Sequence, residues 1–393
     1  MRKIATGKGR ITFGALLGIW SVSALTSLPG LAISPISEKL LDIFPSATDL
    51  DIQLLTTLPS LFIIPFILLA GFISERVGYI KLLYIGLVIF LLSGTLYFFC
   101  ATITQLIVVS VLLGVGAGVI IPLSTALVSK FFVGDERTRQ YGYVSAITNI
   151  SLVVATAVTG WLADIQWRLP FAVYLLPLVS ILLVPAIRRS EDDMTATGNE
   201  PAITNGSINY RPLLRYMLYY LLITYLVMVF SINLPFLLGK LGHDSAVSGM
   251  VLSIFFLAMM LPGLFLNRIL AVVKGWVLQF SLLLILLGIA DIWLNGSLGF
   301  IIIGCVAAGI GYGVAQPYIY DVTASLATGS KVTSALALLM TMNYVAIVIS
   351  PFVIEAIQDV TGLKNETSPF LINAVMALLA LIFVSRYKIY RKR

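Results

Sequence analysis

The sequence predicts an all-α integral membrane protein, in which twelve transmembrane helices form two pseudo-symmetric six-helix bundles. Three observations lead to this prediction: an apolar composition, a glycine pattern that occurs in both halves of the chain, and an uneven placement of basic residues. Of the 393 residues, 59% are hydrophobic and 11% are charged. A soluble domain carries roughly 25% charged residues, so this composition excludes an ordinary soluble protein.

Apolar stretches of the roughly 20 residues needed to cross a bilayer recur along the whole chain. In the first half they span about 12–34, 50–73, 80–100, 104–128, 141–163 and 170–187. In the second half they span about 213–238, 246–267, 270–294, 298–322, 332–357 and 368–386. A polar segment separates the two sets. We therefore expect an N-terminal six-helix bundle over 1–187, a cytoplasmic linker over 188–211 and a C-terminal six-helix bundle over 212–393.

The glycine pattern reads Gly-x-Gly-x-Gly-Val-x-x-Pro and begins at Gly114 and again at Gly309, 195 residues later. Duplicated halves are typical of membrane transporters that alternate between inward-open and outward-open shapes. Glycines four residues apart allow close helix packing, and the following proline can kink the helix. A dinucleotide-binding loop is excluded, because the third glycine comes one residue early and no βαβ unit surrounds it. We expect packing and kinking at Gly114, Gly118, Pro122, Gly309, Gly313 and Pro317.

The basic residues predict the topology. With the N-terminus in the cytoplasm, 21 of the 25 Lys and Arg residues fall in cytoplasmic segments, and the rest are Lys39, Arg168, Lys240 and Lys364. Positive residues remain on the cytoplasmic side of a membrane, so we expect an even number of helices and both termini in the cytoplasm. The formal net charge of +7 then reflects topology and contact with anionic lipids rather than nucleic-acid binding.

The connection between the second and third helices reads Gly71-Phe-Ile-Ser-Glu75-Arg76-Val-Gly78-Tyr-Ile-Lys81. It resembles the loop motif Gly-x-Leu-Ala-Asp-Arg-x-Gly-Arg-Arg/Lys of the major facilitator superfamily, with Glu75 in place of the aspartate. Tyr79 and Ile80 replace the motif's basic pair, and Lys81 comes one position late, so the alternative is a basic loop that serves topology only. The resemblance implies the major facilitator fold and a gating role for Gly71, Glu75, Arg76 and Gly78. In that role the Glu75 carboxylate forms a charge-assisted hydrogen bond that favours the outward-facing state.

Two further segments resemble this family, and two features depart from its nearest branch. Trp167–Phe171 is similar to the family's Trp-Arg-x-x-Phe motif, and Asp135–Gly142 is similar to its Glu-Arg…Gly signature; we expect both to be structural. The nearest branch is the twelve-helix drug–proton antiporters. These exporters carry an arginine in helix four, where this chain has Ser110. They also carry a Gly-Pro pair in helix five, where this chain has Ala155 and Thr156.

Charged residues inside the predicted helices are rare, and an ionisable residue within a membrane is a candidate functional residue. Asp321 follows Pro317 by one helical turn, and the matching position in the first half is Ala126. We expect Asp321 to face the inner cavity and to carry protons, with Asp51 at the outer mouth as a second candidate. The alternative is that Asp321 lies at the cytoplasmic rim and bonds to a loop.

The family resemblance implies a cavity lined by helices 1, 2, 4, 5, 7, 8, 10 and 11. Polar and aromatic side chains on these helices suit a neutral or amphiphilic organic substrate. The alternative for each side chain is an interhelical hydrogen bond, since an unpaired buried polar group is costly. The candidate substrate-binding residues are Trp20, Thr26, Asn149, Tyr219, Tyr220, Tyr225, Asn233, Gln316, Tyr318 and Asn343.

Together these features predict a secondary active transporter of the bacterial plasma (inner) membrane, which moves a small hydrophobic or amphiphilic organic solute by alternating access. Proton-coupled efflux, as in a multidrug antiporter, is the leading interpretation, and an uptake symporter or uniporter is the alternative. An enzyme is not expected, because no His-, Ser- or Asp-based constellation occurs and the single histidine, His243, lies in an outer loop. A primary pump is not expected, because no Gly-x-x-x-x-Gly-Lys-Ser/Thr phosphate loop occurs. We expect a monomer without cofactor, metal or nucleic-acid partner, which contacts its substrate, protons and membrane lipids.

Overall fold

The computed structural model describes residues 3–7, 9–29, 40, 43–45, 49–196, 206–243, 245–363 and 365–386, and helices account for nearly all of them. In the first half these are α1 (Phe13–Ala24), η1 (Leu25–Ser27), α3 (Asp49–Val77), α4 (Tyr79–Tyr97), α5 (Ile103–Phe131), α6 (Gly134–Ile165), η3 (Leu169–Leu175) and α7 (Pro177–Ala196). In the second half they are α8 (Tyr210–Lys240), α9 (Ser245–Leu264), α10 (Leu266–Val273), η4 (Lys274–Trp276), α11 (Val277–Asn295), α12 (Leu298–Ser325), α13 (Lys331–Thr361) and α14 (Ser368–Arg386).

Ten helices in the described part of the chain are long and apolar enough to cross a membrane. Two shorter apolar helical stretches, Phe13–Ser27 and Leu58–Ser74, accompany them. Large apolar side chains cover the outer surfaces of the long helices, as Leu182 and Phe383 illustrate with 72% and 60% of their surface exposed. Apolar surface of this extent requires a nonaqueous surrounding, so the chain is a multi-pass membrane protein.

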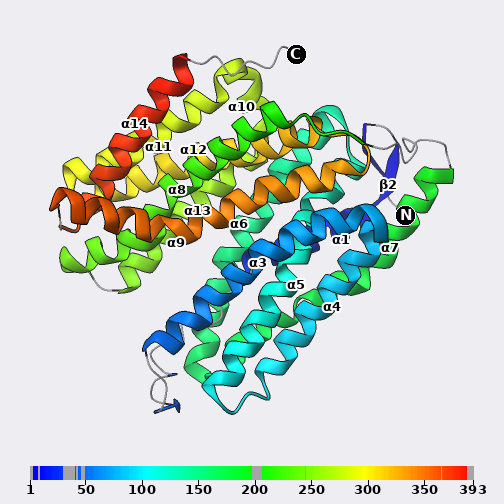
Figure 1. Ribbon diagram of the computed structural model, residues 1–393, viewed down its shortest axis with the longest axis horizontal. Coiled ribbons are helices and arrows are strands. Elements are labelled where there is room, and N and C mark those ends of the chain that lie inside the picture. The colour runs from blue at the N-terminus through cyan, green and yellow to red at the C-terminus, as the bar shows by residue number, and fades with distance from the viewer. Residues whose placement is uncertain are drawn as a thin grey trace.

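The helices pack mainly within their own half of the chain. In the first half α5 lies against α3 and α4, and in the second half α12 lies against α9 and α11. Figure 1 shows the blue and cyan helices of the first half on one side of the molecule and the yellow to red helices of the second half on the other. The halves meet where α3 packs against α13 and α6 against α9. In Figure 1, α3 and α13 lie together at the end of α3 and diverge toward its start.

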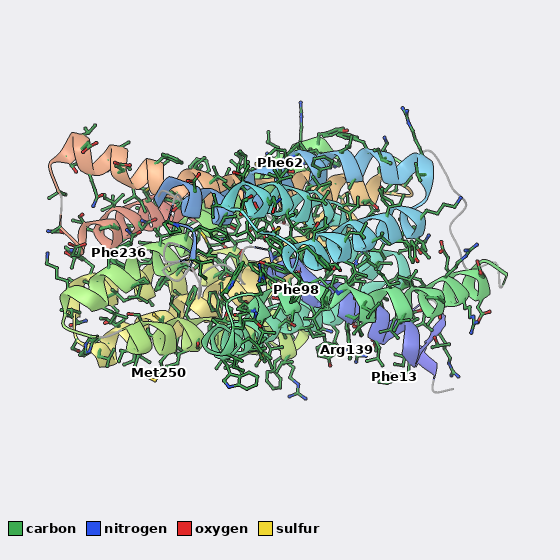
Figure 2. The ribbon with its side chains drawn as sticks, turned by 90° about the horizontal axis from the view of Figure 1, so that it is seen from below. Phe13, Phe62, Phe98, Arg139, Phe236 and Met250 are labelled. Atoms are coloured by element: carbon green, nitrogen blue, oxygen red, sulfur yellow. The ribbon has the colours of Figure 1, made fainter. Side chains whose placement is uncertain are left out.

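The two ends of the molecule are distinguished by residues from both halves. Phe13 and Arg139, near the starts of α1 and α6, lie toward one end in Figure 2, whereas Phe236 and Met250, from the end of α8 and the start of α9, lie toward the other. We name the two ends after the topology that the basic residues predict. The end with the first pair is called the cytoplasmic end below, and the end with the second pair is called the outer end.

Local sequence explains where two of the helices begin. The Thr102 side chain accepts a hydrogen bond from the Gln105 amide, and the Gln105 side chain accepts one from the Thr102 amide, which is a capping box at the start of α5. Gly78 precedes α4 with a φ of 86°, a conformation that glycine adopts without strain. The turn between α3 and α4 therefore depends on this glycine.

Two helices extend beyond their predicted bounds. Helix α6 begins at Gly134, whereas hydropathy predicts a start at residue 141. The prediction is late because a hydropathy criterion excludes the charged first turns of the helix. Asp135 and Glu136 in the first turn stabilise the positive end of the helix dipole, so these charges favour a helix start. Helix α7 continues to Ala196, so the first part of the predicted linker is helical.

Two other helices are shorter or interrupted. Helix α1 ends at Ala24 and passes into the 3₁₀ turn η1, short of the predicted end at residue 34. The predicted helix over 270–294 is broken, because α10 ends at Val273, Lys274 adopts a φ of 50°, and α11 starts at Val277.

The all-α prediction omits one small element, a two-stranded antiparallel hairpin before α1. Strand β1 (Lys3–Ala5) pairs with β2 (Arg10–Thr12), and the strands are too short for an alternating pattern to be read from sequence. The hairpin contacts the loop between α5 and α6, because the Val133 amide donates to the Thr6 carbonyl oxygen over 3.0 Å.

Candidate functional site

The first glycine pattern holds α5 against two neighbouring helices. A Cβ atom at Gly114 would lie 2.6 Å from the carbonyl oxygen of Pro59 on α3, and one at Gly118 would also meet α3. A Cβ atom at Gly116 would lie 2.7 Å from the backbone nitrogen of Phe90 on α4. These separations are too short for any side chain, so the outer glycines contact α3 and the central one contacts α4.

The second glycine pattern repeats this arrangement in α12. A Cβ atom at Gly309 would lie 2.8 Å from the carbonyl oxygen of Phe255 on α9, and one at Gly313 would meet α9 again. A Cβ atom at Gly311 would lie 2.7 Å from the carbonyl oxygen of Ser281 on α11. The helices α5 and α12 therefore occupy matching positions, and Pro122 and Pro317 lie buried in them.

An ion pair joins the two halves at the cytoplasmic end. Arg137 Nε donates to Asp321 Oδ1 over 2.7 Å, and the Thr138 hydroxyl donates to Asp321 Oδ2 over 2.9 Å. Arg137 and Thr138 belong to α6, whereas Asp321 lies on the last turns of α12. Asp321 is only 7% exposed, so both carboxylate oxygens are paired where water is largely excluded. Removing either partner would leave a buried charge without compensation.

Backbone contacts between α6 and α9 reinforce this junction. A Cβ atom at Gly142 would collide with the carbonyl oxygen of Gly263, and one at Gly263 would collide with that of Gly142. One turn of chain further on, Asn267 Nδ2 donates to the carbonyl oxygen of Asp135 over 3.0 Å. The start of α6 is thus held to the second half by an ion pair, a backbone contact and an amide hydrogen bond.

The predicted gating residues between α3 and α4 have different positions. Gly71 lies at the contact with α13, where the Ser334 hydroxyl donates to its carbonyl oxygen over 3.0 Å. Arg76 and Gly78 are exposed at the cytoplasmic end. The side chain of Glu75 lies outside the described part of the structure, so its latching role stays a prediction.

Three predicted substrate-binding residues share a hydrogen-bond network of α8, α12 and α13. The Tyr220 and Tyr320 hydroxyl oxygens are 2.8 Å apart, and Gln316 Nε2 donates to the Tyr220 oxygen over 3.1 Å. Gln316 Nε2 also lies 3.4 Å from the Tyr312 hydroxyl, which donates to Asn343 Oδ1 over 3.2 Å. The network offers neutral donors and acceptors and contains no charged group.

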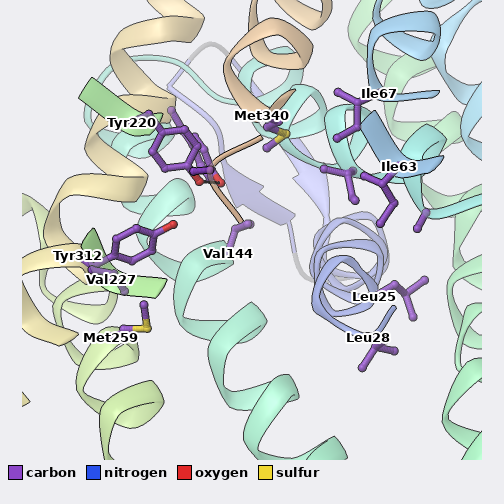
Figure 3. Packing of buried hydrophobic residues seen from close by; sticks show 14 of the residues in the cluster. Leu25, Leu28, Ile63, Ile67, Val144, Tyr220, Val227, Met259, Tyr312 and Met340 are labelled. Atoms are coloured by element: carbon purple, nitrogen blue, oxygen red, sulfur yellow. Dashed lines mark hydrogen bonds between the residues drawn. The ribbon is translucent and has the colours of Figure 1, made fainter. Parts of the chain in front are cut away.

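This network also reaches the first half. The Ser145 hydroxyl on α6 donates to Gln316 Oε1 over 3.1 Å. Figure 3 shows Tyr220 and Tyr312 on one side, Ile63 and Leu25 on the other, and further buried apolar residues of both halves between them. Aromatic and aliphatic groups therefore surround a few neutral polar atoms at the junction of the halves, as in sites for organic ligands.

The remaining predicted substrate-binding residues do not join this network. Trp20 Nε1 donates to Gln140 Oε1 over 3.1 Å and links α1 to α6. Thr26 and Asn149 bond to backbone carbonyl oxygens of the preceding turn in their own segments. The Tyr219 hydroxyl donates to a backbone carbonyl oxygen of α11 over 2.7 Å, which is an interhelical bond of the alternative kind.

Four further candidates lie elsewhere. The Tyr225 hydroxyl and Asn233 Oδ1 on α8 are buried and have no hydrogen-bond partner among the described residues. Tyr318 is half-buried and packs against the apolar core, next to the network. Asp51 is half-buried at the outer end of α3, far along that helix from the Gly71 contact.

A pocket of about 350 Å³ lies apart from these residues, between the outer ends of α4 and α5. Its walls are mostly apolar, and it contains none of the predicted site residues. The lining residues are Leu96, Phe99, Cys100, Thr104, Gln105, Val108 and Val109.

The partners of Asp321 are not apparent from the sequence. Arg137 lies in a charged segment that is expected to be a structural loop, and no sequence pattern distinguishes Thr138. The resemblance of Asp135–Gly142 to a family signature was the one available signal, but it indicated no partner. Tyr312 and Tyr320 were also missed, although both lie within four residues of Gln316.

The chemistry available at this junction is reversible and noncovalent. Neutral hydrogen-bonding groups can recognise an organic solute, and the ion pair can form or break as the halves move. No cluster of three or more His, Cys, Asp or Glu side chains occurs within the described ranges.

Comparisons with known proteins agree with this arrangement. A family model for the Major Facilitator Superfamily matches residues 12–351 and 216–393. The multidrug transporter protein MdtP of Bacillus subtilis (strain 168) is 28% identical over 131 residues, which are 33% of this chain and 23% of that protein. The quinolone resistance protein NorA of Staphylococcus aureus (strain Mu50 / ATCC 700699) is 26% identical over 143 residues, 36% of each chain. These alignments span well under half of either relative.

Solved structures show the same fold over nearly the whole chain. The proton:xylose symporter XylE bound to 6-bromo-6-deoxy-D-glucose has a TM-score of 0.75 and 14% identity, covering 95% of both chains. The human organic anion transporter MFSD10 (TETRAN) has a TM-score of 0.71 and 17% identity, covering 94% of this chain and 97% of the other. The paired glycine helices, the apolar spans and the family match lead to one conclusion: this chain belongs to the Major Facilitator Superfamily, whose members are transporters and not enzymes.

Proposed function

We propose that this protein is a secondary active transporter that exports a small hydrophobic or amphiphilic organic solute by alternating access, coupled to protons. In this proposal twelve membrane helices form two six-helix bundles over 1–187 and 212–393, joined by the segment 188–211. The protein lies in a bacterial plasma membrane with both termini in the cytoplasm, and it acts as a monomer.

The observation that carries the proposal is the junction of Arg137 with Asp321. It crosses between the halves at one end, while α3 and α13 diverge toward the other end. A single ion pair with glycine contacts around it can separate without disturbing the packing within either half. Such a junction suits a two-state gate, and its closed form corresponds to the outward-facing state.

The surroundings of Gln316 support an organic substrate. Tyr220, Tyr312 and Asn343 present neutral polar atoms among apolar side chains, and no described Arg or Lys joins this network. A phosphorylated or strongly anionic solute would lack a counter-charge there. The multidrug and quinolone-resistance names of the two curated relatives favour export of hydrophobic compounds.

A second candidate function is uptake by symport or uniport. Ser110 replaces the helix-four arginine of drug exporters, and Thr156 replaces the helix-five proline. Both departures favour this alternative.

The direction and the coupling can be tested together in liposomes with an imposed pH gradient. Candidate compounds are screened for proton movement and for their own accumulation. Export predicts that the compound and protons move in opposite directions, whereas symport predicts the same direction. Solute movement that is independent of the gradient would contradict proton coupling.

Variants then locate the proton carrier. We expect Asp321→Asn to abolish gradient-driven transport while solute binding remains measurable. Asp291→Asn, a matched change near the outer end of α11, is the control and keeps transport. Equal gradient-driven transport in both variants would remove Asp321 from the coupling mechanism.

A further inference from the structure

The cytoplasmic connection between α9 and α11 exposes an apolar and basic surface. Phe265, Val272 and Trp276 are 52%, 81% and 57% exposed. Arg268 and Lys274 are exposed along the same segment, and neither has an ion-pair partner within the described part of the chain. Large apolar side chains interspersed with cations are typical of a segment that lies at a membrane interface.

The backbone supports a specific role for this segment. Lys274 adopts a φ of 50°, a conformation that favours glycine, although Gly275 follows directly. A non-glycine residue in such a conformation costs free energy, and strained residues of this kind cluster at functional segments. Helix α10 itself buries Leu266 against the rest of the protein and leaves its remaining residues half-buried or exposed.

The segment is connected to the cytoplasmic junction by one side chain. Asn267 of α10 donates to the carbonyl oxygen of Asp135 over 3.0 Å, two residues before Arg137. Gly263, at the end of α9, contacts the backbone of Gly142 on the same helix α6. Opening of the cytoplasmic end must therefore move α10 away from the start of α6.

We propose that α10 and η4 dock on anionic phospholipids of the cytoplasmic leaflet, and that this docking stabilises the closed cytoplasmic end. Arg268 and Lys274 bind the lipid phosphates, while Val272 and Trp276 lie at the boundary of the acyl chains. Docking holds Asn267 in reach of Asp135 and so keeps α6 in its closed position. The coupling to opening rests on the alternating access proposed above, whereas the docking does not.

Quenching by brominated lipids tests the docking. The protein is placed in nanodiscs that contain brominated phosphatidylglycerol or brominated phosphatidylcholine, and Trp276→Phe identifies the Trp276 signal among the five tryptophans. We expect Trp276 quenching to be about twofold greater with the anionic lipid, because two cations attract its headgroup. Arg268→Gln/Lys274→Gln should remove this difference. Equal quenching by the two lipids in the unmodified protein would overturn the docking.

Distances between spin labels test the coupling. Labels at Tyr84→Cys on α4 and Leu214→Cys on α8, both on exposed side chains near the cytoplasmic end, report its width; Cys100 and Cys305 are buried and stay unlabelled. We expect phosphatidylglycerol to increase the short-distance population in the unmodified protein and in Arg188→Gln/Arg189→Gln, the control that removes equal charge elsewhere. Arg268→Gln/Lys274→Gln and Asn267→Ala should lose this response.

The outcomes separate the two ideas. The coupling of docking to closure would be overturned if the protein showed two distance populations whose proportions did not change with the lipid. It would also be overturned if Asn267→Ala showed the same increase in the short-distance population as the unmodified protein. A single distance in every lipid, with and without a pH gradient, would instead contradict alternating access, while the quenching result would still decide the docking.

Discussion

Helices α5 and α12 share a frame but differ in the side chains that it carries. In each, three glycines contact two helices of its own half: α3 and α4 for α5, and the equivalent pair α9 and α11 for α12. At matching positions α5 has Ile121 and Ala126, whereas α12 has Gln316 and Asp321. The duplicated glycines thus position the two helices alike, and at these two matching positions only α12 carries polar side chains.

The difference decides how each helix contacts the opposite half. From α12, Asp321 pairs with Arg137, and Gln316 accepts a hydrogen bond from Ser145. From α5, the side-chain hydrogen bond to the other half within the described residues is that of the Thr125 hydroxyl, 3.7 Å from the sulfur of Met340, a weak acceptor. A symmetric scaffold therefore supports an asymmetric junction, and variants that exchange features between the two helices can test this view.

The largest effect is expected at the ion pair. Asp321→Ala, which introduces the residue of α5, leaves the largely buried Arg137 side chain, 16% exposed, without its counter-charge. This change should destabilise the closed state by about 3 kcal/mol, roughly a 150-fold shift toward opening. The Tyr84–Leu214 label distance measures this shift. The double variant Arg137→Ala/Asp321→Ala should recover part of the closed population, since no unpaired charge remains. An unchanged distance distribution in Asp321→Ala would show that the pair does not hold the gate.

The glycine frame should be equally sensitive in both halves. Gly118→Leu and Gly313→Leu each force a side chain against neighbouring backbone, which should lower the free energy of unfolding by about 2–3 kcal/mol. Thermal unfolding in detergent, followed by tryptophan fluorescence, measures the loss. Gly160→Leu on α6, where no atom lies within 4 Å of the added Cβ, is the control and should change little. Destabilisation by one substitution but not the other would contradict a shared frame.

The polar network should affect substrate binding more than stability. Gln316→Ile removes a hydrogen-bond partner from the Tyr220 and Tyr312 hydroxyls. We expect the free energy of solute binding to become less favourable by about 1–3 kcal/mol. Ile121→Gln, the reverse exchange in α5, should leave affinity within error. Binding of a solute identified in the liposome screen is measured by fluorescence or calorimetry. Equal affinities in the two variants would place the site elsewhere.

The smallest effect is expected at Ser145. Ser145→Ala removes one neutral hydrogen bond between the halves and should cost the closed state about 1 kcal/mol. The same pair of spin labels detects a modest increase in the open population. If opening increased as much as in Asp321→Ala, the contact at Gln316 rather than the ion pair would dominate closure.

The membrane helices and the equivalence of α5 and α12 could be predicted from the composition and the repeat in the sequence, whereas the contacts between the halves could not. The repeat correctly indicated that Gly114 and Gly309 lie in matching helices. Asp321 is a candidate functional residue because it is a rare charge in an apolar stretch. Its partner Arg137 lies 184 positions away in the sequence, and no local sequence pattern indicates a contact between residues so far apart.

Hydropathy also gives the wrong start for the helix that carries Arg137. Because Asp135–Arg139 is charged, a hydropathy criterion excludes this segment from the helix and predicts that Arg137 lies in a loop. The structure continues α6 through this segment, which places the arginine at a fixed position facing α12. Tyr219 shows the converse, since its hydroxyl donates to a neighbouring helix rather than to the network, and its role in substrate binding stays a prediction.

The N-terminal hairpin has a practical consequence for anyone who handles this protein. The carbonyl oxygen of Thr6, in the turn after β1, accepts a hydrogen bond from the amide of Val133, the residue that precedes α6, so the hairpin contacts the helix that carries Arg137. We expect an affinity tag fused close to the hairpin to disturb this hydrogen bond, with an effect on transport that would be assigned wrongly to the variant under study. Tags are better placed after Arg386, and slow hydrogen exchange at the Val133 amide would verify that the hairpin is intact.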